Sequence, residues 1–118
     1  YPPFVAAKPF PTMDDYVGNI DYLVQLVGID HVGISSDYTY QISMSEAEQK
    51  AGWKMMIDSG AWSKEAYPYD VLAYPEGLET PKTFFNLTDA LLGRGYKKED
   101  IAKLWGGNML RVMRAVVG

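Results

Sequence analysis

Residues 29–37 read Ile-Asp-His-Val-Gly-Ile-Ser-Ser-Asp, a short, mainly apolar run that follows Gly28 and ends in polar residues. A run of this length, bounded by turn residues and containing β-branched side chains, is typical of a buried strand. We therefore expect one strand here, ending at Asp37. In α/β proteins the functional side chains lie where a strand ends and its loop begins, so Asp37 is the first candidate site residue.

The residues before this run predict a helix. Thr12 and Asp15 have the spacing of a capping box, and Gly28 stands where a C-terminal cap is expected. Between them, apolar residues recur along one helical face. These residues are Met13, Tyr16, Val17, Ile20, Leu23, Val24 and Val27. So short a connection from helix to strand suits a parallel sheet or a barrel. No second convincing strand is present, so its hydrogen-bonding partner is expected from residues 67–74 or from another polypeptide.

Residues 38–85 are rich in aromatic residues and interrupted by glycine and proline. Ser45 is placed to cap a helix from Glu46 to about Ile57. A segment of this length is often a lid or a binding loop. We favour the other interpretation, in which the aromatic side chains pack over the end of the strand, because aromatic rings contribute strongly to burial wherever they occur.

Residues 86–118 predict short helices, with Asn86 and Asn108 as N-caps and a break at Gly106-Gly107. The whole chain is therefore expected to be a single partial domain. Its parts are residues 12–37 (helix and strand), 38–85 (an aromatic-rich insertion loop) and 86–118 (C-terminal helices).

Composition excludes several classes of function. The net charge of −4 argues against a nucleic-acid surface, and without an apolar run of 18 residues no transmembrane segment is expected. The absence of cysteine excludes disulfides and thiolate metal sites. A single histidine, His31, cannot supply the two or three imidazoles that a zinc enzyme usually uses, and we expect it to be structural. Ser35 and Ser36 lack the glycine elbow and the second histidine that a serine nucleophile needs.

A series of short segments carries a more specific signal. In chain order they are Asp15-Tyr16-Val17, Ile20-Asp21-Tyr22-Leu23-Val24, residues 27–34 with Ser36-Asp37, Pro75-Glu76-Gly77-Leu78-Glu79, Asn86-Leu87-Thr88, Leu91-Leu92 with Arg94-Gly95-Tyr96, and residues 99–103 and 107–112. Their order and spacing resemble the C-terminal part of the membrane (renal) dipeptidase family. The likeness covers almost the whole chain except residues 39–74.

The resemblance implies a zinc-dependent peptidase that hydrolyses dipeptides on a (β/α)8 barrel. It also implies two zinc ions, whose histidine, aspartate and glutamate ligands all precede the matched region. The chain would be the C-terminal third of that barrel, with residues 31–36 as the last strand. The fold class expected from it is α/β, mostly helical, with one parallel-type strand. No metal ligand is expected within this chain, and zinc is not expected to bind to it alone.

Asp37 matches the first aspartate of the family's Gly-Asp-Phe-Asp-Gly-like motif. The resemblance implies that this carboxylate orients the attacking water and passes its proton to the leaving amine. Tyr38 and Tyr40 stand in the altered part of the motif and are candidate substrate-binding residues. Ser35 and Ser36 replace glycines there, and Tyr38-Thr39-Tyr40 replaces Phe-Asp-Gly.

Three functional hypotheses follow. The chain is the C-terminal segment of a dipeptidase-like hydrolase, inactive alone and completed by the upstream part of the same barrel. Alternatively, it is a non-catalytic binding or interaction module, or a relative that has lost catalysis through the altered loop after Asp37. Unpaired sheet edges and exposed apolar surface would favour a homo-oligomer if the chain occurs alone. The sequence leaves the cellular compartment open.

Overall fold

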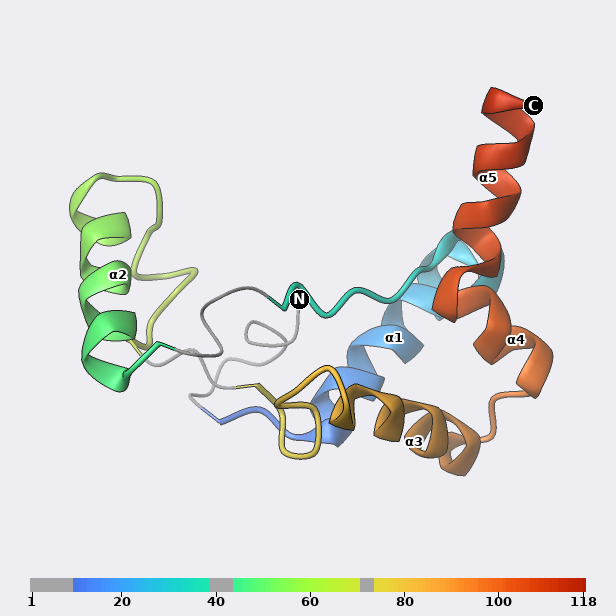
Figure 1. Cartoon of the computed structure of the whole chain (residues 1–118), viewed down its shortest axis with the longest axis horizontal. Helices are drawn as coiled ribbons and strands as arrows, with labels where there is room; N and C mark the ends of the chain where they lie inside the picture. Colours follow the sequence, from blue (N-terminus) through green and yellow to red (C-terminus); the bar gives the residue numbers. More distant parts are fainter. Residues whose placement is uncertain (1–9, 39–43, 71–73) are drawn as a thin grey trace.

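The computed structural model describes residues 10–38, 44–70 and 74–118. The helices in these ranges are α1 (Met13–Val27), α2 (Glu46–Asp58), α3 (Asn86–Arg94), α4 (Lys98–Ala102) and α5 (Asn108–Val117). Helices α1, α3, α4 and α5 occupy one end of the molecule, whereas α2 lies apart from them at the other end (Figure 1). The radius of gyration of 16.0 Å exceeds the value of about 13 Å expected for a compact chain of this length.

The predicted strand is wrong. Within the described ranges no residue belongs to a sheet, so the α/β class and the expected barrel strand are not supported. Ile29–His31 form a single 3-10 turn, in which the His31 amide donates to the Gly28 carbonyl at 3.1 Å. The backbone then runs extended from Val32 without a neighbouring strand. The alternative partner, residues 67–74, forms no strand either in the part that is described, and residues 71–73 lie outside it.

Other groups satisfy the extended segment's hydrogen bonds in place of a strand. The Ile34 amide donates to the Leu104 carbonyl at 3.0 Å. The Asn108 side-chain amide donates to the Val32 carbonyl at 2.8 Å, and the Tyr16 hydroxyl donates to the Ser35 carbonyl at 3.1 Å. The short apolar run and its β-branched side chains predicted a buried strand, but an extended, partly buried segment can also take its hydrogen bonds from partners other than a strand.

The predicted N-cap residues can be compared with the residues at which the helices begin. The capping boxes at Thr12 with Asp15 and at Ser45 with Glu48 are both formed. Asn86 and Asn108, in contrast, are the first residues of α3 and α5 and cap neither helix. The predicted break at residues 106–107 is a π-turn, Lys103–Gly107, which connects α4 to α5 and in which only Gly106 leaves helical geometry.

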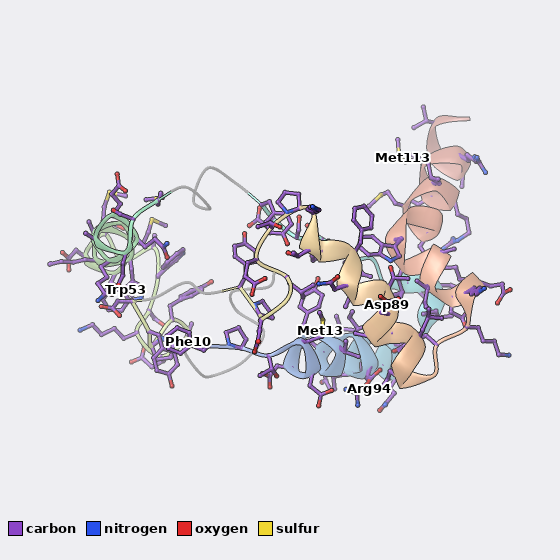
Figure 2. The ribbon with its side chains drawn as sticks, turned by 60° about the horizontal axis from the view of Figure 1, so that its bottom comes forward. Phe10, Met13, Trp53, Asp89, Arg94 and Met113 are labelled. Atoms are coloured by element: carbon purple, nitrogen blue, oxygen red, sulfur yellow. The ribbon has the colours of Figure 1, made fainter. Side chains whose placement is uncertain are left out.

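The hydrophobic core lies between α1, α3, α4 and the extended segment. Its buried residues are Tyr16, Val17, Ile20, Val32, Leu78, Phe84, Leu87, Leu91, Ile101 and Leu104. An ion pair between Arg94 of α3 and Asp14 of α1, at 2.7 Å, lies at its edge. Only part of the predicted apolar face of α1 is covered, since Leu23 and Val27 are exposed. Apolar residues of α5 are also exposed, and Figure 2 shows Met113 on a part of that helix that projects from the other elements.

Tyr16 predicts how stability depends on alkaline pH. Burial, with a smaller contribution from Tyr38, raises the pKa of the Tyr16 phenol to about 12. Below pH 10 this phenol is protonated in the folded and unfolded chains alike. Between about pH 10 and 12 only the unfolded chain releases the proton, so the free energy of unfolding should fall by about 2–3 kcal/mol from this group.

Urea unfolding between pH 8 and 11.5 measures this slope. Tyr16→Phe should make it shallower, while Tyr38 and Tyr96, whose pKa values are also raised to about 12, keep part of it. The substitution should cost about 1 kcal/mol at pH 7 through the lost hydrogen bond. Tyr22→Phe is the matched control, since Tyr22 is an exposed tyrosine of the same helix. An unchanged slope in Tyr16→Phe would contradict the assignment.

Candidate functional site

Asp37 lies at the end of the extended segment, with its side chain exposed. Along this segment the buried and exposed positions alternate: Val32 is buried and Ser36 and Tyr38 are half-buried, while Ser35 and Asp37 are exposed. The carboxylate of Asp37 therefore faces away from the core. It is available to a molecule from solution, as a carboxylate that acts on substrate must be.

The backbone of Asp37 is unusual. Its φ of 50° is positive, and among the non-glycine residues that the structure describes it is alone in this. Aspartate tolerates the left-handed region better than most residues do, but the conformation still requires support from its surroundings. The candidate catalytic residue thus adopts left-handed backbone at the end of the extended segment.

Tyr38 packs into the protein next to this turn. The centroid of its ring lies 5.0 Å from that of Tyr74. It lies 5.5 Å from the centroid of Phe84, and these two rings meet edge to face. Its hydroxyl donates to the Leu78 carbonyl. Burial, with a smaller effect of the Glu79 charge, raises the pKa of Tyr38 to about 12, so the phenol is neutral at physiological pH. Tyr40, the other predicted substrate contact, lies outside the described residues.

A set of aromatic rings extends from this point into the core. Phe84 contacts Tyr16 and Trp105, with centroid distances of 6.3 and 5.4 Å. The aromatic residues of 44–70 form a second, separate cluster beside α2. There the Trp53 indole donates to the Tyr67 carbonyl at 3.0 Å, and Trp62 stacks on Tyr67 at 4.5 Å. Figure 2 shows Trp53 far from Met13 and Asp89 of the main body.

The described residues do not fit a zinc site. In this part of the chain no three His, Cys, Asp or Glu side chains are grouped so that they could hold a metal ion. His31 is exposed and lies in the 3-10 turn, at the opposite end of the extended segment from Asp37. The two residues therefore do not form a common site.

Two residues that hold the extended segment were not selected from the sequence for the roles they have. Tyr74 donates its hydroxyl to the Asp37 carbonyl at 3.2 Å. Asn108 is buried and donates to the carbonyls of Ile29 and Val32, although its spacing before an apolar helix suggested a cap. No periodic pattern or motif spacing indicates the contact of Tyr74, which joins residues 37 positions apart.

The family model for membrane dipeptidase, peptidase family M19, matches residues 1–59 and 67–117. Only residues 60–66 and Gly118 fall outside the matched ranges. No curated protein and no solved structure matches the chain. In the described ranges, the helices are too short or too polar to span a bilayer.

Proposed function

We propose, because the chain belongs to the membrane dipeptidase family, that it forms the C-terminal segment of a dipeptidase and supplies Asp37 to the active site. The observation that carries this proposal is the family match over both sides of the Asp37 turn. The exposed carboxylate of Asp37 supports it, because a side chain that acts on a bound dipeptide must be reachable.

The chemistry asked of Asp37 is proton transfer. In peptide hydrolysis a water molecule attacks the carbonyl carbon, the C–N bond breaks, and one proton of that water must reach the leaving amine. A carboxylate within hydrogen-bond reach can accept this proton and then donate it to the nitrogen. Tyr38 is proposed to contact substrate through its ring, since its hydroxyl is already bonded to Leu78. Tyr40 is proposed as a second substrate contact.

We further propose that the zinc ions implied by the family resemblance are held by residues outside this chain. The lack of a suitable group of ligands among the described residues supports this. The chain alone should then bind no stoichiometric zinc and hydrolyse no dipeptide.

The experiment compares the 118-residue chain with a longer gene product that contains it. After dialysis against metal-free buffer and addition of Zn²⁺, metal content and hydrolysis of a dipeptide panel are measured for both. We expect zinc and hydrolysis in the longer protein and neither in the chain alone. Stoichiometric zinc in the chain alone would contradict the proposed origin of the ligands. A zinc-loaded longer protein without dipeptidase activity would contradict the proposed function.

A second candidate function is a non-catalytic interaction module that self-associates. The observation that favours it is the apolar surface of α5, where six large hydrophobic residues are exposed: Met109, Leu110, Val112, Met113, Val116 and Val117. Exposed apolar surface of this extent is typical of an interface. Sedimentation equilibrium on the same samples separates the two functions. A dimer of the longer protein that lacks hydrolysis would favour the module.

A further inference from the structure

The backbone around Asp37 is held from several elements. Tyr16 of α1 donates to the Ser35 carbonyl, two residues before Asp37, at 3.1 Å. Ser36 accepts the Tyr38 amide on its hydroxyl at 3.4 Å. The Tyr38 hydroxyl is bonded to Leu78, beyond the insertion. These bonds fix the residues on each side of Asp37 but do not contact Asp37 itself.

Tyr74 is the residue that reaches Asp37 directly. Its hydroxyl donates to the Asp37 carbonyl at 3.2 Å, across 37 positions in sequence. Its ring packs on Tyr38 at 5.0 Å, so hydroxyl and ring hold two consecutive residues. The carbonyl that Tyr74 binds belongs to the residue with the positive φ. A bond at this carbonyl restrains the rotation that would return Asp37 to extended backbone and redirect its side chain.

Tyr38 and Tyr74 also flank, in sequence, the segment that carries α2. The two rings contact each other, with 5.0 Å between their centroids. Figure 1 shows α2 apart from the other helices. Tyr74 therefore supplies, from beyond α2 in sequence, a hydroxyl to the backbone of the candidate catalytic residue.

We propose that Tyr74 is a positioning residue for Asp37, holding its backbone so that the carboxylate meets substrate in one orientation. This inference rests on the proposed function for its catalytic consequence. Small displacements of a catalytic group can cost a large factor in rate. Loss of the hydroxyl should therefore lower kcat by about 10- to 100-fold and leave KM nearly unchanged.

Two measurements on Tyr74→Phe test the proposal. The first is backbone ¹³C NMR of the 118-residue chain, in which the Asp37 shifts should move from left-handed toward extended values. The second is kcat and KM of the zinc-loaded longer protein on a dipeptide that the wild type hydrolyses. Tyr22→Phe is the matched control, since it removes a hydroxyl from an exposed tyrosine of α1. It should change neither measurement.

The outcomes separate the inference from the function on which it rests. Unchanged Asp37 shifts in Tyr74→Phe would overturn the positioning role, even if the longer protein is an active dipeptidase. Moved shifts with an unchanged kcat would overturn its catalytic part. A wild-type protein that hydrolyses no dipeptide would overturn the proposed function and the catalytic part together, while the NMR result still decides whether Tyr74 holds the Asp37 backbone.

Discussion

On the proposed function, Asp37→Asn should lower kcat for dipeptide hydrolysis by about 10²- to 10⁴-fold in a zinc-loaded protein that contains this chain. The carboxamide keeps the size and shape of the side chain but cannot accept and return a proton at neutral pH. Asparagine also tolerates the left-handed backbone that Asp37 adopts at φ 50°. The turn should therefore survive the substitution. A loss of rate would then report the missing carboxylate and not a rearranged loop.

The matched control is Asp58→Asn. Asp58 is an exposed carboxylate at the end of α2 that pairs with Lys54 on the same helix, and surface pairs of this kind contribute little to stability. The kcat of Asp58→Asn should equal that of the wild type. Initial rates over a range of dipeptide concentrations give kcat and KM for all three proteins. Wild-type kcat in Asp37→Asn, with the fold intact by circular dichroism, would remove Asp37 from the reaction.

Local signals in the sequence predicted where helices begin, whereas the predicted α/β fold class was wrong. The capping boxes at Thr12 and Ser45 place the starts of α1 and α2, because such caps depend on residues three positions apart. The strand at residues 29–37 was wrong because strand formation depends on a partner that the pattern does not identify. Leu104, Asn108 and Tyr16 supply its hydrogen bonds instead. These residues lie far from the segment in sequence.

At the candidate site, too, the sequence indicated local features but not contacts between residues far apart in sequence. The sequence indicated where Asp37 and Tyr38 stand, at the end of an extended segment and within a recognisable motif. It did not indicate Tyr74, because a hydroxyl reaching a carbonyl across 37 positions leaves no periodic or spacing signal. Nor did it distinguish a buried asparagine from a cap at residue 108, since both precede an apolar helix.

Asn108 is expected to stabilise strongly the start of the extended segment. It is buried at the start of α5, and its amide nitrogen donates to the Ile29 carbonyl at 2.7 Å and to the Val32 carbonyl at 2.8 Å. Asn108→Ala should lower the free energy of unfolding by about 2–4 kcal/mol, because buried carbonyls lose their donor. Against a total of about 5–15 kcal/mol, such a loss threatens folding at 37 °C. Urea unfolding at 25 °C measures it.

Two further variants identify the cause of that loss. Asn108→Asp keeps the size of the side chain but replaces its donors by a carboxylate facing two carbonyl oxygens, so it should destabilise at least as much as alanine. Asn19→Ala is the control, because Asn19 is exposed on α1 and bonds to the Asp15 carbonyl of its own helix. It should change stability by less than about 0.5 kcal/mol. If Asn108→Asp is as stable as the wild type, packing and not hydrogen bonding holds this part of the chain. The Asn108 amide would then not be what substitutes for a neighbouring strand.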